Sequence, residues 1–309
     1  PRHLPHGRPP PAARAGEIGY RWLQVVAEGG GWTRVRADVT DILIEKGVAV
    51  GVRLADGEEI RADQVVSAIG VANTIRHLLP ESYRNEKWAQ SVLDLRPSYA
   101  HVCLYIGFKG DIRKAGATAA NKWFYHSWDM NQDVWRIDGE AEGWPPAPVL
   151  YCSFGSLKNP THEPGPEQRH MGEVITFVPW EVFAPWQGTD WRKRGAAYDG
   201  LKEEMQGRLL QQFLEHMPGL RGMVDYVELS TPLSTDHFVR PQMGSIYGLE
   251  PTGERFQNEW LRPASPIPNL YFGGSEVSAV GVIGAMMGGV LAAAAARPWQ
   301  VLPFLKRLM

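Results

Sequence analysis

The chain has 309 residues, 44% of them hydrophobic and 21% charged, which excludes wholesale disorder, a coiled coil and a disulfide-rich miniprotein. Thirty-two basic residues face 34 acidic ones, and a net charge of −2 gives no support for nucleic-acid binding, which usually needs a basic surface. The two cysteines, Cys103 and Cys152, have neither a metal-ligand spacing nor a CxxC partner. We therefore expect no metal site and no disulfide framework, and a reducing compartment such as the cytoplasm.

The N-terminal segment, residues 1–30, is predicted to be an irregular extension. Its first 14 residues hold five prolines and three arginines and no acid. Proline this dense blocks both helices and strand pairing. The segment also lacks the apolar core of a secretory signal.

A β-meander is predicted within residues 31–95. Residues 39–44 (VTDILI) form one strand pattern, apolar residues alternate in 48–54, and the Asp56-Gly57 pair that follows is a strong hairpin signal. Residues 64–69 (QVVSAI) are typical of a buried strand, which ends at Gly70. The meander would deliver this strand into a larger sheet.

The middle of the chain, residues 96–240, combines strands with one long helix. Apolar residues recur every three to four positions from 198 to 216, as in a helix packed on one face. Strand patterns separated by turns occur at 99–108, 123–127, 149–154, 173–178 and 224–229. This pattern predicts an α+β layer, an antiparallel sheet covered by a helix.

The strongest signal lies near the C-terminus, where a short strand (270–272) runs into Gly273-Gly274-Ser275-Glu276 and 20 uncharged residues follow. Three interpretations remain open for that apolar segment. It is long enough to span a bilayer, and Gly284 and Gly288 form a GxxxG step. Its abundance of alanine and glycine instead favours a buried helix whose backbone approaches a neighbour closely.

The third interpretation is a cofactor helix. The N-terminus of a helix presents unpaired N–H groups and partial positive charge, so a strand that enters a glycine turn before such a helix makes an anion site. Glu276 in this turn would accept hydrogen bonds from sugar or ribityl hydroxyls. A purely structural crossover has the same pattern.

The stretch LYFGGSEVSAVGVIGAMMGGVLAA resembles the C-terminal flavin motif of FAD-dependent carotenoid and retinoid oxidoreductases. These are the phytoene-desaturase-like and retinol-saturase-like relatives of the amine-oxidase flavoproteins. Colinear segments, among them VTDILIEKGVAVGVRLADGEEIRADQVVSAIG and STPLSTDHFVRPQMGSIYGLEP, extend the resemblance over residues 31–296.

The resemblance implies an α/β fold: an incomplete, Rossmann-like FAD domain in 31–95 and 241–309, and an antiparallel-sheet-and-helix substrate domain in 96–240. It implies FAD as the cofactor. Matched positions near that cofactor are Val39, Ala68, Gly70, Gly274, Glu276, Gly281, Val282 and Ile283. At Glu276 many relatives have aspartate, which is one methylene shorter.

The family's N-terminal strand, GxGxxG turn and helix, which hold the FAD pyrophosphate, have no match in this sequence. The three glycines at 29–31 precede a strand and do not open a helix. We therefore expect a partner chain to supply the missing segment.

The family's substrates imply a dry apolar slot beside the flavin and, since such a substrate comes from lipid, peripheral contact with a membrane. Aromatic residues are the candidates for lining the slot, although ordinary core packing would explain each of them equally: Trp123, Phe124, Tyr125, Trp128, Phe177, Trp180, Phe183, Trp186 and Tyr247. Trp180, Phe183 and Trp186 could instead mark a membrane-facing entrance.

No residue is assigned a catalytic role. His101, His126 and His237 are candidate acid–base groups with structural roles as the alternative.

The first functional hypothesis is an FAD-dependent oxidoreductase that desaturates, saturates or isomerises carbon–carbon double bonds of an apolar polyene. The alternatives are a cofactor-free fragment that binds an apolar ligand or a partner, and a flavin amine oxidase. Fold alone does not choose among these chemistries.

Overall fold

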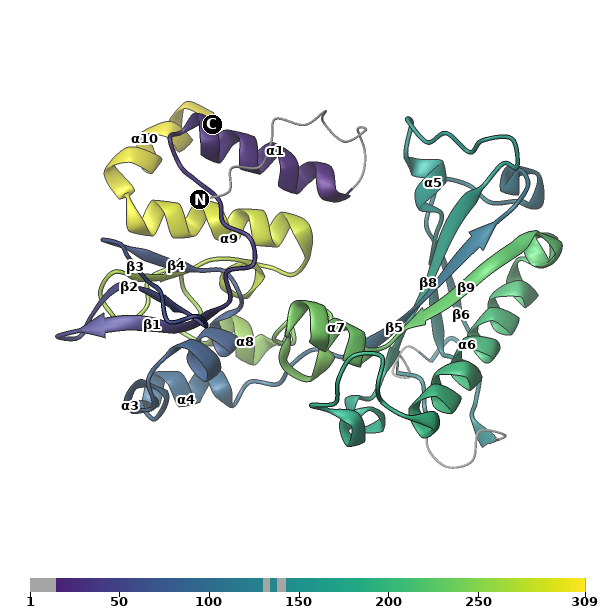
Figure 1. Ribbon diagram of the computed structural model, residues 1–309, viewed down its shortest axis with the longest axis horizontal. Helices are drawn as coiled ribbons and strands as arrows, with labels where there is room; N and C mark the ends of the chain where they lie inside the picture. Colours follow the sequence, from purple (N-terminus) through teal and green to yellow (C-terminus); the bar gives the residue numbers. More distant parts are fainter. Residues whose placement is uncertain (1–14, 130–133, 138–142, 309) are drawn as a thin grey trace. The chain divides into compact units, whose positions relative to one another are not determined.

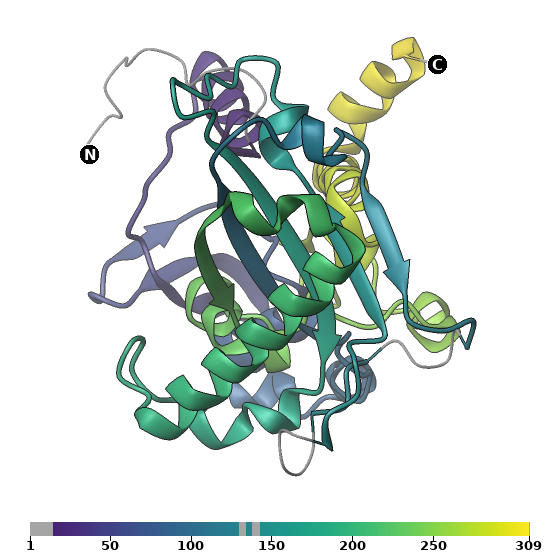
Figure 2. The ribbon, with the colours of Figure 1, turned by 90° about the vertical axis from the view of Figure 1, so that its right-hand side faces the viewer.

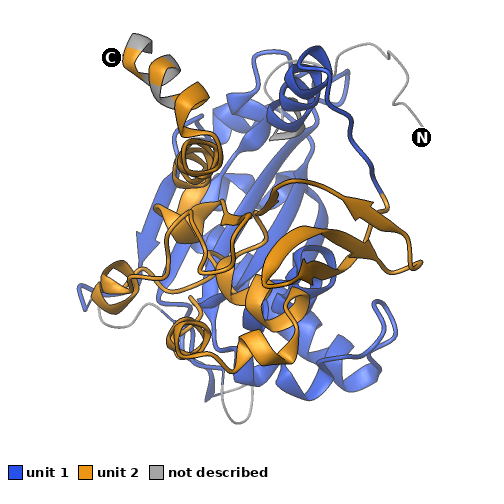
Figure 3. Ribbon diagram, turned by 90° about the vertical axis from the view of Figure 1, so that its left-hand side faces the viewer, with its two compact units in different colours: residues 1–35, 99–244 blue, residues 36–98, 245–309 orange. Residues whose placement is uncertain are grey.

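The computed structural model describes residues 15–129, 134–137 and 143–308. It divides the chain into two compact units, coloured separately in Figure 3. Unit 1 contains residues 1–35 and 99–244, and unit 2 contains residues 36–98 and 245–309. The boundaries at 98/99 and 244/245 lie close to the expected ones at 95/96 and 240/241.

Helix α1, Ala15–Glu28, contradicts the irregular extension expected up to residue 30. The prolines on which that expectation rested all lie at or before residue 11. Beyond them Ile18, Trp22 and Val25 recur at the four- and three-residue spacing of one helix face, which the density of prolines upstream obscured. Residues 1–14 lie outside the described part of the chain.

Unit 1 is built on a five-stranded antiparallel sheet in the order β6-β7-β8-β5-β9 (Figure 1). Its strands are β5 (Ala100–Phe108), β6 (Lys122–Tyr125), β7 (Val149–Ser153), β8 (His170–Val178) and β9 (Val224–Ser230). Its α-helices besides α1 are α5 (Gly155–Lys158), α6 (Ala196–His216) and α7 (Pro232–Val239), and short 3-10 helices connect the elements. The predicted antiparallel sheet with a long helix is confirmed.

The core of unit 1 lies between this sheet and α6, which crosses one face of it in Figure 2. Strand alternation explains the packing, since every second residue of β5 points to that face. Leu104 and Ile106 on β5 are buried there in one cluster with Leu209 and Phe213 of α6.

Unit 2 holds a three-stranded antiparallel sheet, β1-β2-β3, and a separate parallel pair, β4 and β10. The strands are β1 (Val39–Glu45), β2 (Val48–Leu54), β3 (Glu59–Arg61), β4 (Val65–Ser67) and β10 (Leu270–Phe272). The helices are α2 (Val71–Asn73), η1 (Thr74–Leu78), α3 (Glu81–Arg84), α4 (Lys87–Leu93), α8 (Gly253–Gln257), η8 (Ser275–Val277), α9 (Gly281–Ala296) and α10 (Pro298–Leu308). Its core is a second hydrophobic cluster that includes Ile75, Leu270 and Phe272.

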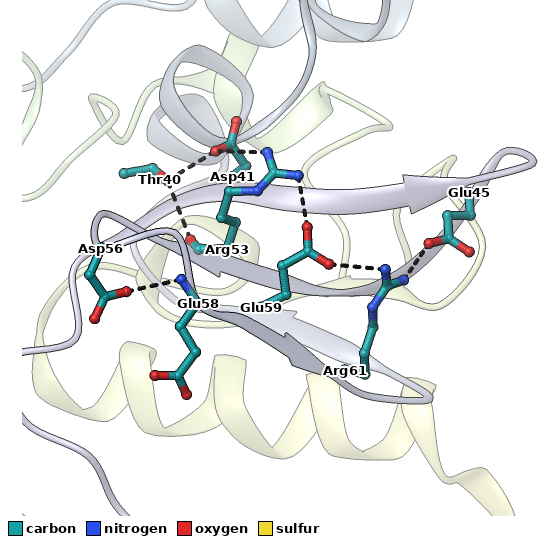
Figure 4. Close-up of polar contacts among 8 residues, drawn as sticks. All are labelled: Thr40, Asp41, Glu45, Arg53, Asp56, Glu58, Glu59 and Arg61. Carbon is teal, nitrogen blue, oxygen red and sulfur yellow. Dashed lines mark hydrogen bonds and ion pairs between the residues drawn. The ribbon is translucent and has the colours of Figure 1, made fainter.

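The meander β1–β3 carries a ladder of alternating charges on its exposed face (Figure 4). Arg53 lies between Asp41 and Glu59, and Arg61 lies between Glu59 and Glu45. The hydrogen bond from Arg53 holds the pKa of Glu59 below its ordinary value. Because these pairs are exposed, each stabilises the fold little, and because every acid of the ladder already has a cationic partner, we assign it no chemistry.

Helix α9 is 16 residues long and begins four residues after the start of the uncharged segment. Among the helices of the described residues, none combines the length and the apolar character that crossing a membrane requires.

Candidate functional site

The carboxyl ends of β4 and β10 form one edge of unit 2, because the two strands run parallel and pair in register. The chain leaves β4 through Gly70, at φ +97°, and leaves β10 through Gly274, at φ +91°. Backbone of this kind is readily adopted only by glycine. We call residues 68–70 and 273–276 the glycine edge. Two segments 200 residues apart in sequence thus turn at the same place.

Glu276 joins three segments at the glycine edge. Its side chain is buried, and its Oε2 accepts hydrogen bonds from the backbone N–H of Val71 at 2.6 Å and of Ala72 at 3.3 Å. Its Oε1 accepts the N–H of Leu249 at 3.2 Å. The carboxylate therefore connects the turn after β10 to the turn after β4 and to the loop before α8.

Two glycines make room for this carboxylate. A Cβ at Gly70 would lie 3.1 Å from Oε1 of Glu276, and one at Gly248 would lie 2.5 Å from the same atom. Both residues also have positive φ angles, +97° and +69°. Gly248 was not identified from the sequence as part of this site, because its contact with Glu276 is visible only in the fold.

Arg255 closes the same network and was missed entirely from the sequence. The side chain is 2% exposed, and its Nη1 and Nη2 donate to the carbonyl oxygens of Leu249 at 2.5 Å and Ser275 at 2.6 Å. Burial holds the pKa of Arg255 below its ordinary value, and the nearby Glu276 carboxylate opposes that shift. No pattern in the segment GERFQ indicates this role.

The predicted contact of Glu276 with sugar or ribityl hydroxyls stays a prediction. A carboxylate has about four lone-pair positions, and three backbone N–H groups already use this one. The geometry gives Glu276 a holding role in the chain itself. That role explains why an acid is needed at this place whether or not a sugar approaches it.

The start of α9 is open, and this is where the structure fits a flavin. Gly281 has φ +85°, and nothing lies within 4 Å of the position that a Cβ would take. Val280, the N-cap residue, provides no side-chain cap. The first N–H groups of any helix lack intrahelical partners, and no side chain caps them here. The side chains of Val282 and Ile283 in the same turn are 61% and 75% exposed. Backbone donors flanked by apolar surface suit the polar edge of a flat aromatic ring.

The remaining residues predicted to lie near the cofactor occupy two separate places in unit 2. Ala68, Gly70, Gly274 and Glu276 come together at the glycine edge, where the carbonyl oxygen of Ala68 lies 3.4 Å from the Cβ position of Gly274. Val39 begins β1, in the other sheet of unit 2. Its predicted contact with adenine stays a prediction.

Unit 1 presents an aromatic face on the side of its sheet opposite α6. We define this aromatic face as Tyr105, Trp123, Tyr125, Tyr151, Phe177 and Tyr226. Trp123 contacts Tyr151 edge to face at 4.9 Å between ring centroids and stacks on Tyr125 at 6.4 Å. Because Trp123 and Tyr125 remain about half exposed, the face offers apolar surface to a ligand.

The aromatic residues predicted to line a substrate slot do not all lie together. Trp123, Tyr125 and Phe177 lie on the aromatic face, whereas Phe124 points to the core side and stacks on His216 at 4.3 Å. Trp128 follows β6 and is fully exposed. Tyr247 belongs to unit 2, is 41% exposed and donates its backbone N–H to Ser98.

Trp180 and Phe183 are core residues, so their prediction as slot-lining or membrane-facing residues is wrong. They are 7% and 0% exposed and belong to the hydrophobic cluster beneath α6. Trp186 packs against the same cluster and contacts Tyr198 edge to face. The two short 3-10 turns of this segment fold its aromatic side chains inward, which the sequence spacing did not reveal.

The candidate acid–base groups are scattered over unit 1. His101 lies partly buried on β5, and burial lowers its pKa. His237 stacks on Trp191, and His126 follows β6 on the surface. Both thiols are buried, which raises the pKa of Cys103 and Cys152 to about 12 and makes them poor nucleophiles. Within the described residues, no three His, Cys, Asp or Glu side chains gather as metal ligands do.

Residues 22–297 match the family model described as flavin containing amine oxidoreductase. The all-trans-retinol 13,14-reductase of Danio rerio is 28% identical over 298 residues, covering 93% of this chain and 49% of that protein. A phytoene desaturase (neurosporene-forming) of Cereibacter sphaeroides is 27% identical over 269 residues, 84% of this chain and 48% of the relative. The chloroplastic prolycopene isomerase of Arabidopsis thaliana is 25% identical over 246 residues, with 79% and 37% covered.

These matches confirm the resemblance drawn from the C-terminal motif. Among solved structures, reduced UDP-galactopyranose mutase superimposes with a TM-score of 0.52 at 14% identity, over 88% of this chain and 49% of that one, which shows a common fold. The chain spans about half the length of the retinol reductase and the desaturase that it matches.

Proposed function

Because the chain belongs to the flavin-containing amine oxidoreductase family, we propose that it serves in an FAD-dependent oxidoreductase acting on carbon–carbon double bonds of an apolar polyene. The observation that carries the proposal is the uncapped start of α9 beside the glycine edge, within the matched segment. The names of the relatives, a retinol reductase, a phytoene desaturase and a prolycopene isomerase, support a polyene substrate.

The flavin would be held by backbone groups more than by side chains. The N–H groups of Gly281, Val282 and Ile283 would meet the ring system, and the glycine edge would carry the chain that links the ring to the nucleotide. Glu276 and Arg255 would fix that edge from within. A bound flavin supplies hydride or electron transfer, for which the protein provides orientation and exclusion of water.

The aromatic face supplies the apolar surface that a polyene needs. Rings such as Trp123 and Tyr151 meet edge to face and present a preformed wall, so little side-chain freedom is lost when a ligand binds. Aromatic rings also bind cationic amines, so the names of the relatives, and not this face, favour a polyene over an amine. A cofactor-free protein that binds an apolar ligand or a partner is the remaining alternative.

We also propose that a partner chain supplies the nucleotide-binding segment that the resemblance implies. We further propose that the protein is cytoplasmic and contacts a membrane peripherally, because an apolar substrate is delivered from lipid.

The flavin proposal is tested by the visible absorption spectrum of the purified chain before and after incubation with FAD and desalting. We expect retained flavin bands, and we expect Gly281→Val to abolish them, because a β-branched side chain tolerates the φ of +85° poorly and fills the open space at the start of α9. The control is Gly289→Ala, a substitution in the same helix with no neighbour within 4 Å, which should keep the bands.

If the purified protein is colourless, either the nucleotide-binding segment is missing from the sample or the protein binds no flavin, and a second sample separates these explanations. The same measurement is made with the nucleotide-binding segment of a relative added as a separate polypeptide. Flavin retention only in the mixture supports the partner chain. No retention in either sample contradicts the proposal of a flavin enzyme.

Substitution of Trp123 tests the aromatic face. We expect Trp123→Ala to weaken the binding of all-trans-retinol by about tenfold, because aromatic contacts of this kind contribute about 0.5–1.5 kcal/mol beyond the area that they bury. The enhancement of retinol fluorescence on binding gives the affinity. Trp128→Ala, at a fully exposed tryptophan off the sheet, is the matched control and should bind normally. Equal losses in the two variants would show that the aromatic face is not the binding surface.

A further inference from the structure

A second site lies in unit 1, at the free edge of β9. There β5, β9, the first turns of α6 and helix α7 border an open pocket of about 620 Å³. This volume falls within the range of about 300–1,000 Å³ that holds small molecules in proteins. All of the residues that line it belong to unit 1. Of its lining residues, Tyr105 also belongs to the aromatic face and His101 is one of the candidate acid–base groups, and the others have no role in the sequence analysis or the proposed function.

Three cations line this pocket without a carboxylate partner. Arg192, Arg194 and Lys202 have no acid within ion-pair distance in the described part of the chain, where the ion pairs involve other basic residues. Arg194 donates one N–H from Nη2 to the carbonyl oxygen of Leu233 at 3.2 Å. Its Nε is buried and has no hydrogen-bond partner. Because a guanidinium can only donate, that nitrogen lacks an oxygen acceptor.

The acids of the pocket leave it positive. Asp199 and Glu228 also line it, so the lining cations exceed the lining acids by one. Asp236 of α7 lies behind the lining, where burial raises its pKa and the nearby Arg194 opposes that shift. Glu228 already accepts a hydrogen bond from the hydroxyl of Tyr226 at 2.6 Å. His101, a further lining residue, has its pKa lowered by burial and adds no charge at neutral pH. The balance favours an anionic group over a cationic one.

The mouth of the pocket is apolar. Trp191 and Phe238 meet edge to face at 5.2 Å between ring centroids, and the guanidinium of Arg192 lies 4.3 Å from the centre of the Trp191 ring. Phe238 and Val239 are 65% and 71% exposed. Exposed apolar side chains that adjoin one another are typical of a surface that binds a ligand. That ligand needs an apolar body and an anionic end.

We propose that this pocket binds an amphipathic anion, a long apolar chain that ends in a carboxylate or a phosphate. The head group lies at Arg194 and Lys202, and the chain lies over Trp191 and Phe238. Oxygen atoms of the head group accept N–H groups that the guanidinium of Arg194 presents to the pocket, and charge-assisted bonds of this kind are the stronger class. The site goes beyond the proposed flavin chemistry, and because it needs no flavin, its test is independent of whether flavin binds.

Calorimetric titration of the full chain with octanoate, octyl phosphate and 1-octanol tests the proposal, each below its micelle concentration. We expect at least one anion to bind about tenfold or more tightly than octanol, as a hydrogen-bonded charge implies. The tighter of the two anions identifies the head group. Octanol bound as tightly as both anions would overturn the proposal.

Variants locate the binding. Arg194→Gln and Lys202→Gln should each bring the anion within about threefold of octanol and leave octanol binding unchanged, because they remove the charge and keep the apolar wall. Lys202 donates no hydrogen bond within the described chain, so its substitution tests the charge even where Arg194→Gln disturbs the fold. Phe238→Ala should weaken all three ligands alike.

The control is Lys193→Gln, an exposed neighbour that pairs with Asp190 at 3.6 Å and does not line the pocket. It should bind all three ligands normally. An equal loss in Lys193→Gln and Lys202→Gln would show a general charge effect and overturn the site. A last outcome combines two measurements. If the chain sediments with vesicles of phosphatidylcholine and phosphatidylglycerol but binds neither octyl anion, the residues contact a membrane surface, and the proposed small-molecule pocket is overturned.

Discussion

Replacement of Glu276 by glutamine is expected to lower the free energy of unfolding by about 2–5 kcal/mol, because a buried N–H that loses its acceptor costs about 1–3 kcal/mol. The carboxylate accepts from Val71, Ala72 and Leu249 through two oxygens. The glutamine amide has only one oxygen, so its NH₂ group replaces one of the two carboxylate oxygens. That NH₂ group then faces backbone N–H donors, which lose their acceptor. The shape is conserved, so the effect isolates the hydrogen bonds from packing.

Hydrogen exchange gives a local measurement of this effect. In Glu276→Gln, amide protection should fall in the peptides that contain Val71, Ala72 and Leu249, and the urea midpoint should fall with it. Glu259→Gln is the matched control, since that side chain is exposed and lies near α8. Unchanged protection at all three amides would show that Glu276 does not hold the glycine edge together.

The local part of the fold was predictable because it depends on periodic patterns. The strand patterns at 39–44 and 48–54 became β1 and β2, and the three- to four-residue spacing from 198 became α6. The alternation of side chains along a strand also predicts which face each aromatic residue occupies, which the residue type alone does not. Trp123 and Tyr125 share one face of β6, and Phe124, grouped with them as an aromatic residue, must face the other way.

The glycine edge could be predicted only in part, because its contacts join distant segments. The motif Gly273-Gly274-Ser275-Glu276 indicates a turn that needs glycine, and the structure has that turn. The partners of Glu276 at Val71 and Leu249 are set by the parallel pairing of β4 with β10, which no local pattern specifies. Arg255 is hidden for the same reason, since its two acceptors are backbone carbonyls available at any sequence position.

Close packing of α9 on the glycine edge explains its small residues. A Cβ at Gly288 would lie 1.9 Å from the carbonyl oxygen and 2.7 Å from the carbonyl carbon of Gly274. A Cβ at Gly284 would meet the carbonyl oxygen of Ala279 at 1.7 Å. The GxxxG spacing thus lets the helix backbone touch the turn that precedes it. This is the close approach that the abundance of glycine predicted.

Gly288→Ala is therefore expected to destabilise the protein strongly and to disturb the proposed flavin site. The neighbouring atoms belong to the backbone, so the helix or the turn must move, and overpacking of this kind costs about 1–3 kcal/mol or more. For Gly289→Ala, at the adjacent residue, we expect the opposite change in the free energy of unfolding. It is exposed with nothing within 4 Å, so alanine should stabilise the helix by about 0.5–1 kcal/mol.

Urea unfolding of the two variants and the wild type measures the contrast, and the two effects have opposite signs for the same chemical change. The added methyl group has the same hydrophobicity at both positions, so the difference reports only the space available. If Gly288→Ala unfolds at the same urea concentration as Gly289→Ala, α9 does not pack on the Gly274 turn. The N–H groups at the start of α9 would then lack the fixed relation to the glycine edge on which the flavin proposal depends.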